Sequence, residues 1–357
     1  MDAGHNHLLH GGAAVLFFYI VSGFYMALVL NEKYKIGVKS FYLARFMRIF
    51  ATYWAAMAIM IAWTLWWGGV PDYAQLPLRG QVATVVMNAF IFGRGWFELA
   101  ASGQAPLLAD WAMSLFGRPF ELYRGLIGQA WTLEVELGFY LVAPFIVRSP
   151  MRIALFFFGS FILRLFLVVS GVGTVSWGYY ILPTTLCLFL LGGAAYWLYR
   201  GVVGWRWSRV IGMYAMVGML AAAIAWGRVG SPAAQPSAWA QYDRLELWGS
   251  YLIFAFLLPF VFVRFKDNFL DRAIGELSYP LYLIHGLTLG IVINILNAGQ
   301  RTEPVKLEAV GASLLAALVI HVLVERPTDL LRAVALRRAT RFRLGTPLIP
   351  KIGRPTS

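Results

Sequence analysis

The residues best suited to chemistry are two carboxylates inside an apolar stretch. Residues 129–144, QAWTLEVELGFYLVAP, carry Glu134 and Glu136. A carboxylate in hydrocarbon costs at least a few kcal/mol, so one that persists there is a functional candidate. On a helix these two positions lie roughly 200° apart, at about 100° per residue, and cannot share a face. We expect one glutamate to face the protein interior and the other to lie nearer the interface; a pair of interfacial acids at the end of a span is the alternative.

Histidine is the natural general base near neutral pH, and the chain has five. His285 lies inside the apolar segment SYPLYLIHG, where it should face a cavity or a partner; a hydrogen-bonded packing histidine is the alternative. His321, in LVIHVLVE, is expected to be structural. His5, His7 and His10 precede the first apolar segment. We expect no metal site there, because no helix or hairpin presents these side chains as ligands.

Three arginines lie in or beside apolar segments. Arg164, in FILRLFLVV, must pair or extend toward the interface, and Glu136 is a candidate partner. Arg45 and Arg48 are three positions apart and share a helix face at the inner membrane boundary. That geometry suits a phosphate-rich cytosolic ligand; ordinary positive anchoring is the alternative. Cys187 is the only cysteine and is expected to pack in the core, so the sequence has no disulfide framework and no CxxC metal pattern.

The composition is that of a polytopic membrane protein. The 357 residues are 60% hydrophobic and only 13% charged, and the mean hydropathy is +0.67. Soluble domains are usually about 45–50% apolar and roughly 25% charged. A net charge of +13 would fit nucleic-acid binding, but the basic residues fall between apolar segments, where membrane topology explains them. We expect one all-α transmembrane domain over residues 1–330, followed by a basic cytoplasmic tail over 331–357.

Nine apolar segments near 20 residues in length are typical of spanning helices. They cover residues 12–30, 49–70, 131–147, 152–170, 179–199, 209–226, 246–265, 278–297 and 307–325. Residues 81–93 are apolar but too short for an easy crossing, which favours a re-entrant or interfacial segment.

Lysine and arginine counts orient these spans. The connections 31–48, 148–152, 200–209 and 264–272, with the tail from 326, hold 21 such residues; the alternate connections hold 8. The first set is therefore predicted to be cytoplasmic, with the C-terminus inside and, for nine spans, the N-terminus outside. An exported N-terminus of about ten residues without a signal sequence is unusual, so we expect an earlier span to be missing.

The connection 71–130 is the one long external segment, and loops of this length are usually functional. It contains Trp96, Phe97, Trp111, Phe116, Phe120 and Tyr123 among glycines and a few charges. Aromatic faces flanked by arginine and acid suit a sugar-like or amphipathic ligand; an interfacial aromatic belt is the alternative. By pattern alone, a transporter and a transmembrane transferase both fit the chain.

Five segments, in order, resemble the membrane-bound acyltransferase 3 family of bacterial O-acyltransferases. They are LFFYIVSGF (16–24), FYLARFMRIFATYW (41–54), WTLEVELGFY (131–140), LSYPLYLIH (277–285) and VERP (324–327). Ala51 stands where the family commonly has proline. The resemblance places the family glutamate on Glu136 rather than Glu134, and it implies ten spans. The family is expected to begin with a span carrying an arginine and, about ten residues later, a histidine that acts as the base. This chain starts after most or all of that span, so we expect that the base lies upstream of Met1, that the chain is an inactive truncation, or that His5, His7 or His10 replaces the base.

The resemblance implies an enzyme of the bacterial inner membrane that transfers an acyl group, most often acetyl, from cytosolic acyl-CoA to a carbohydrate hydroxyl. No bound cofactor is implied, and acetyl-CoA would be a co-substrate. The partners would be the carbohydrate acceptor and the lipid bilayer, with no nucleic acid. The candidate site residues are Glu136, His5, His10 and His285 for catalysis, Arg45 and Arg48 for the CoA phosphates, and Trp131, Tyr282 and Arg164 for substrate. A multi-pass exporter of a small molecule or glycan precursor remains the alternative function.

Overall fold

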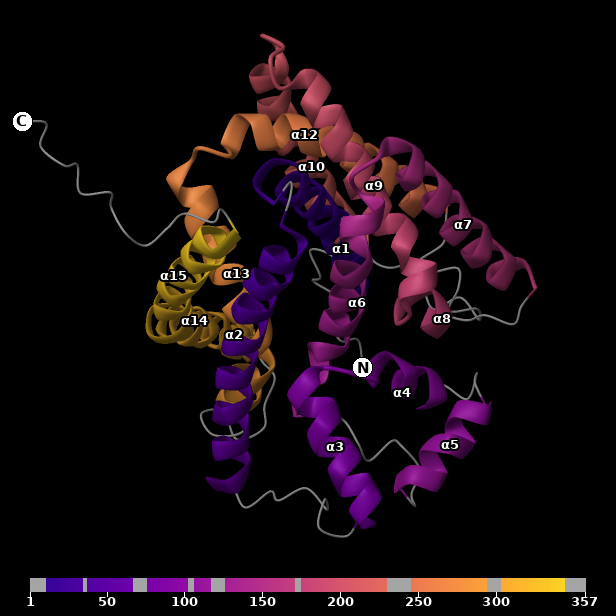
Figure 1. The fold of residues 1–357 in the computed structure, drawn as a ribbon, viewed down its shortest axis with the longest axis vertical. Helices are drawn as coiled ribbons and strands as arrows, with labels where there is room; N and C mark the ends of the chain where they lie inside the picture. The colour runs from indigo at the N-terminus through magenta and orange to yellow at the C-terminus, as the bar shows by residue number, and fades with distance from the viewer. Residues whose placement is uncertain are drawn as a thin grey trace, which may run out of the picture.

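The computed structural model describes residues 11–34, 37–66, 76–101, 106–116, 126–170, 175–229, 245–293 and 303–343. No strand occurs in these ranges, so the predicted all-α class is confirmed. The helices form a bundle with a layer of three short helices at one end (Figure 1).

The first half of the chain forms α1 (Gly11–Leu28), its π-helical extension η1 (Val29–Lys33), α2 (Val38–Trp66), α3 (Leu78–Phe90), α4 (Arg94–Ala101), α5 (Pro106–Phe116), η4 (Gly128–Ala130), α6 (Trp131–Ile146) and α7 (Pro150–Val169). The second half forms α8 (Val175–Tyr179), α9 (Leu182–Val202), α10 (Ser208–Val229), α12 (Leu245–Phe265), α13 (Phe269–Ile291), α14 (Glu303–Ile320), the π-helical η6 (His321–Glu325) and α15 (Arg326–Arg343). α15 runs through the domain boundary predicted at residue 331.

Six helices in the described part of the chain are long and apolar enough to cross a membrane. They cover Ala14–Lys33, Val38–Trp66, Pro150–Val169, Trp177–Val202, Leu247–Phe265 and Leu307–Ala335. Each overlaps a predicted span. α2 begins well before the predicted residue 49, so Arg45 and Arg48 lie on the helix itself.

The other three predicted spans coincide with helices that do not meet these requirements of length and apolar composition. α6 has 16 residues and contains both glutamates, and α10 qualifies only as a shorter apolar helix over Ser208–Ala223. α13 carries Asp271, Arg272 and Glu276 near its start. The count of nine spans and the orientation of the termini therefore stay predictions.

A close crossing of α1 and α9 forms the centre of the bundle. A Cβ atom added at Gly23 would lie 1.8 Å from the carbonyl oxygen of Phe189, and one at Gly192 would lie 1.9 Å from that of Ile20. Only glycine allows two backbones to approach this closely, as in other membrane helix pairs. The Phe189 ring then stacks between Tyr19 of α1 and Phe139 of α6, which joins the three helices.

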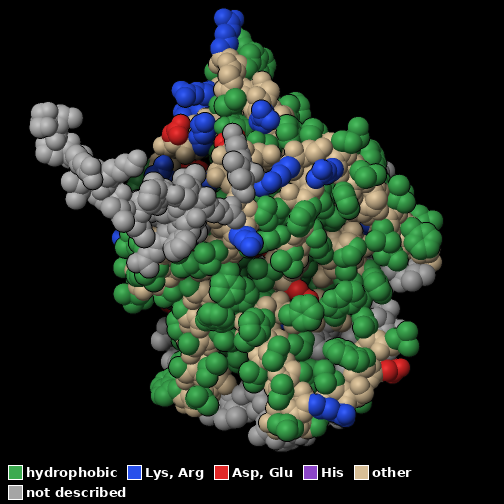
Figure 2. Space-filling view, in the orientation of Figure 1, with side chains coloured by type: hydrophobic (Ala, Val, Ile, Leu, Met, Phe, Trp, Pro, Cys, Tyr) green, Lys and Arg blue, Asp and Glu red, His purple; other side chains and the backbone are tan. Residues whose placement is uncertain are grey.

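The bundle has one predominantly basic end. Asn31 and Trp197 donate side-chain hydrogen bonds to the carbonyl oxygen of Val147, so the C-terminal ends of α1, α6 and α9 meet there. Lys266, which follows α12, lies over the ring of Tyr199 in the same region. On the face drawn in Figure 2, hydrophobic side chains cover the middle of the molecule and most Lys and Arg side chains gather toward this end. Such a distribution is what a bilayer requires of the surface that it surrounds.

The long connection 71–130 is built mainly of α3, α4 and α5 at the opposite end (Figure 1). α3 includes most of the segment predicted to be interfacial or re-entrant, and it exposes Leu78, Val82 and Val85. Among the aromatic residues predicted to bind a ligand, Trp96 and Trp111 are exposed, whereas Phe116 is buried in a small core with Leu76. The Phe97 side chain, Phe120 and Tyr123 lie outside the described residues.

We predict that Gly23→Ala disrupts the bundle. The added methyl group would overlap the backbone of α9, which forces the two helices apart at a cost of at least about 1–3 kcal/mol. The yield of monodisperse protein after detergent extraction and its melting temperature should both fall. Gly159→Ala on α7 is the matched control, because nothing lies within 4 Å of a Cβ atom at that position. Equal behaviour of the two variants would contradict the proposed crossing.

Candidate functional site

The Glu136 carboxylate is held in the interior of the bundle by two hydroxyl groups. Its Oε1 atom accepts a hydrogen bond from Ser22 Oγ of α1 at 2.9 Å and another from the Tyr140 hydroxyl one helical turn later on α6. Glu136 is 6% exposed. Of the two glutamates, Glu136 is therefore the one that faces the protein interior.

The other oxygen of the Glu136 carboxylate, Oε2, is available to a ligand. Within the described residues, no hydrogen bond reaches Glu136 Oε2. The nearby Tyr19 hydroxyl is fully buried and also lacks a partner in this part of the chain. Buried polar groups are normally hydrogen-bonded, so the unpartnered Tyr19 hydroxyl deserves a functional explanation. Here an acceptor and a donor remain available to a reacting group.

Arg45 and Arg48 supply positive charge to this centre from α2. Both guanidinium groups act electrostatically on the Glu136 carboxylate. The Arg45 guanidinium lies over the rings of Phe41 and Tyr140, at 5.8 Å and 5.7 Å from their centroids, and so reaches Glu136 through Tyr140. Arg48, one helical turn further along the same face of α2, is exposed and lines a neighbouring pocket. The structure thus relates both predicted phosphate-binding arginines to the predicted catalytic glutamate.

A polar junction connects the start of α6 with α13. The Tyr282 hydroxyl donates to the carbonyl oxygen of Gln129 at 2.7 Å and lies 2.5 Å from Thr132 Oγ1. In return, Gln129 Nε2 donates to the carbonyl oxygens of Tyr282 and Leu283. Thr132 precedes Glu136 by one helical turn, so Tyr282 lies on the same side of α6 as the carboxylate.

His285 is oriented by the same junction. Its Nδ1 atom lies 2.8 Å from the carbonyl oxygen of Tyr282. A carbonyl can only accept, so Nδ1 carries the proton and Nε2 of the neutral ring is left as a proton acceptor. The side chain is exposed, and its ring centroid lies 5.9 Å from that of Tyr282. No contact between His285 and Glu136 occurs among the residues that the structure describes.

In contrast to Glu136, Glu134 has both carboxylate oxygens occupied by hydrogen bonds from the backbone. Its two oxygens accept hydrogen bonds from the backbone N–H groups of Gly93 and Gly95, at 2.9 Å and 2.6 Å. Gly93 has φ 82°, a conformation that glycine adopts at little cost. Glu134 therefore anchors the turn between α3 and α4.

Two predicted substrate ligands prove to be engaged in packing. The ring of Trp131 is half-buried against Tyr179 and Tyr180, with centroids 4.6 Å and 4.5 Å away. Arg164 is 2% exposed and donates to the carbonyl oxygens of Gly178 and Thr184. Its guanidinium thus satisfies backbone groups where the helix breaks before α9, which corrects the suggested pairing with Glu136. These contacts favour a structural role for Arg164, and its role as a substrate ligand stays a prediction.

The predicted catalytic histidines His5 and His10, together with His7, lie outside the described residues. Ser22, Tyr140 and Thr132 were missed as site residues. The spacing of four between Glu136 and Tyr140 was a usable signal, because such positions adjoin on a helix. Ser22 could not be paired with Glu136 from sequence, since the two are 114 positions apart. Within the described residues, no group of three or more His, Cys, Asp or Glu side chains is placed to hold a metal ion.

A family model described as an acyltransferase domain matches residues 3–325 of the 357-residue chain. Comparisons with curated proteins and with solved structures gave no match.

We predict that Arg164→Met destabilises the protein while leaving its chemistry intact in the fraction that folds. The change leaves two buried carbonyl groups without their donor, at a cost of about 1–3 kcal/mol. The melting temperature in detergent should fall, and activity normalised to folded protein should not. Arg152→Met on the same helix is the control, because Arg152 donates its hydrogen bond at the exposed surface. A stable but inactive Arg164→Met protein would return this residue to the substrate site.

Proposed function

Because the chain belongs to the acyltransferase domain family whose model matches residues 3–325, we propose that this multi-pass membrane protein is an O-acetyltransferase of the bacterial inner membrane. The acetyl donor is cytosolic acetyl-CoA, and the acceptor is a hydroxyl group of a cell-surface polysaccharide or lipid-linked sugar. Family membership supports acyl transfer. The donor, the acceptor and the membrane are our proposal.

The main observation behind the proposal is that only one of the two carboxylate oxygens of Glu136 is hydrogen-bonded within the described residues. Ser22 and Tyr140 fix one oxygen, while the other has no partner in the described residues. A carboxylate held in this way can accept a hydrogen bond from a reacting group, or it can stabilise a cation that forms beside it. Both roles contribute to catalysis when the surroundings exclude water.

The reaction transfers the acetyl group from the sulfur of the CoA thioester to the oxygen of the acceptor hydroxyl group. The acceptor oxygen attacks the thioester carbonyl carbon, the C–S bond breaks, and CoA leaves as a thiol after taking up the proton. A histidine accepts the proton from the hydroxyl group, as is common for general bases. His285 is positioned for this role by its free Nε2 atom, and His5 and His10 remain candidates. If His5 or His10 is the base, Glu136 would orient that histidine or stabilise its charged form.

Arg45 and Arg48 are proposed to meet the phosphates of the donor. Arginine binds phosphate well because its planar guanidinium group donates several hydrogen bonds at once. Arg48 is the more accessible of the two, since the guanidinium group of Arg45 is engaged with aromatic rings. Both lie on the first half of α2, and the topology predicted from the sequence places this half of α2 toward the cytosol, where acetyl-CoA is available.

We predict that Glu136→Gln removes acetylation without unfolding the protein. The amide preserves size and one acceptor oxygen but cannot stabilise a neighbouring cation, so the transfer rate should fall by about 10²-fold or more. The measurement is the alkali-labile acetyl content of cell-surface glycans by proton NMR. It compares the intact gene, a deletion and Glu136→Gln, with protein amounts checked by immunoblot.

Glu32→Gln is the matched control, because Glu32 is an exposed carboxylate in η1. Acetyl lost in the deletion but kept in Glu136→Gln would remove Glu136 from the site. Acetyl unchanged in every strain would contradict glycan acetylation, and solute export would then be measured instead.

A further inference from the structure

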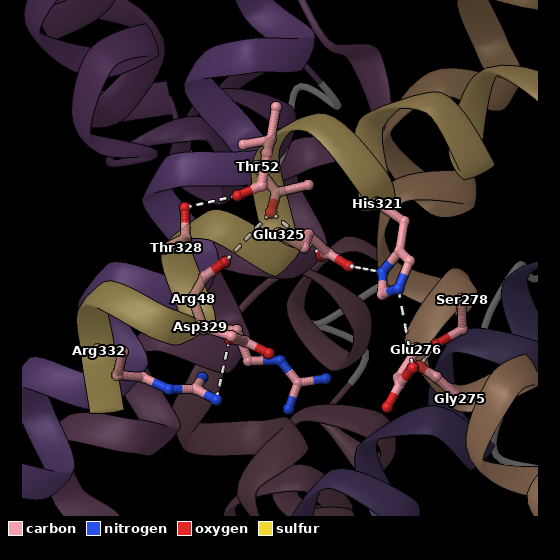
Figure 3. A network of polar contacts seen from close by, with 11 residues as sticks. Arg48, Thr52, Gly275, Glu276, Ser278, His321, Glu325, Thr328, Asp329 and Arg332 are labelled. Atoms are coloured by element: carbon pink, nitrogen blue, oxygen red, sulfur yellow. Dashed lines mark hydrogen bonds and ion pairs between the residues drawn. The ribbon is translucent and has the colours of Figure 1, made fainter. Parts of the chain in front are cut away.

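A second polar cluster lies beside the proposed site, further along the face of α2 that also carries Arg45. Four elements form it: α2 contributes Arg48 and Thr52, α13 contributes Glu276, η6 contributes His321 and Glu325, and α15 completes it (Figure 3). These side chains line a pocket of about 190 Å³. Pockets that enclose a whole drug-sized ligand measure about 300–1,000 Å³, so this one fits the end of a larger molecule.

Part of the cluster is engaged internally. Glu325 accepts hydrogen bonds from Thr52 at 3.1 Å and from His321 Nδ1 at 2.8 Å. The other ring nitrogen of His321 faces Glu276 at 3.8 Å. These contacts join α2, α13 and η6 into one wall. η6 is a π-helical turn, a distortion that is frequent at functional sites.

Other groups of the pocket stay available to a ligand. No hydrogen bond or ion pair within the described residues involves the Arg48 guanidinium. Arg332 pairs with Asp329 at 2.9 Å, but the Asp329 side chain is 56% exposed, and exposed pairs of this kind are weak. The side chain of Glu276 is also half-exposed, and its only ion-pair contact among the described residues is the long one to His321.

These open groups define the chemistry of the ligand. Two arginines extend to the same side of the network (Figure 3), where they can share a phosphate group through charge-assisted hydrogen bonds. Glu276 of α13 is an acceptor, suited to an N–H donor such as the amino group of a nucleobase. A ligand that offers both an anion and such a donor is a phosphorylated nucleoside.

We propose that this pocket binds the 3′-phosphoadenosine end of the acyl-CoA donor, with the phosphate between Arg48 and Arg332 and the adenine amino group toward Glu276. This assignment rests on the proposed function. It adds Arg332 and Glu276 as donor-binding residues and gives α15 a part in recognition. Arg332 leaves Asp329 to meet the phosphate, so Asp329 competes with the ligand.

The test is direct binding of 3′,5′-ADP, the isolated nucleotide end, to the purified full-length protein in nanodiscs by isothermal titration calorimetry. Arg332→Gln should weaken binding by about tenfold or more, since a hydrogen bond to a charged group is lost. Asp329→Asn should strengthen binding, because it frees Arg332. Inorganic phosphate should bind more weakly than 3′,5′-ADP.

Arg326→Gln is the matched control, because Arg326 is an exposed arginine of the same helix that does not line the pocket. The proposal is overturned by an absence of 3′,5′-ADP binding, by equal losses in the two arginine variants, or by phosphate binding as tightly as the nucleotide. A merely structural role for Arg332 and Asp329 would not give effects of opposite sign.

Kinetics separate this proposal from the proposed function. Arg332→Gln should raise KM for acetyl-CoA but leave kcat/KM for acetyl-pantetheine, which lacks the nucleotide, unchanged. Acetyl transfer with an unaltered KM for acetyl-CoA would refute the pocket and leave the transferase standing. Nucleotide binding with the expected pattern, but no transfer from either donor, would refute the acetyltransferase and leave the pocket standing.

Discussion

The burial of the Glu136 carboxylate is the constraint on which the rest of the structure depends. A carboxylate inside an apolar bundle is tolerated only when donors satisfy it. Tyr140 is available from the same helix, but Ser22 must come from α1. α1 is brought into place by its crossing with α9, which Gly23 and Gly192 make close enough for backbone contact. The segment SGF is therefore explained residue by residue: the serine holds the carboxylate, the glycine permits the crossing, and Phe24 is fully buried.

The polar residues of the bundle fall into two groups according to what they contact. Glu134, Arg164 and Gln129 bind backbone groups at places where a helix begins or breaks. Such contacts satisfy N–H and C=O groups that water cannot reach in a membrane. The carboxylate of Glu136 is bound by side chains alone and retains a free oxygen within the described residues. A buried ionisable residue is thus a better functional candidate when backbone groups do not account for its burial.

α2 connects the two proposed sites. Along one face of this helix, Arg45 contacts Tyr140 beside Glu136, and Thr52, two turns later, contacts Glu325 of η6. A donor bound between these sites would place its anionic end beside Arg48 while its acyl end approaches the carboxylate. Tyr279 of α13 donates to the carbonyl oxygen of Ile49, so α13 is attached to α2 between the sites. A movement of α13 would then affect both proposed sites.

The sequence by itself determined the helical class and most helix positions, and it singled out Glu136 as a candidate, because hydrophobic runs and an acid within them are local properties of the chain. It also placed Arg45 and Arg48 on one helix. The tertiary structure alone decided which side chains meet. It showed Arg164 bound to carbonyl groups rather than to Glu136, because a cation in an apolar run takes whatever acceptor lies nearest in space. It likewise brought Ser22 to Glu136 and Thr52 to Glu325, residues separated by 114 and 273 positions. Helix periodicity cannot predict contacts over such separations, since they depend on how closely the helices cross.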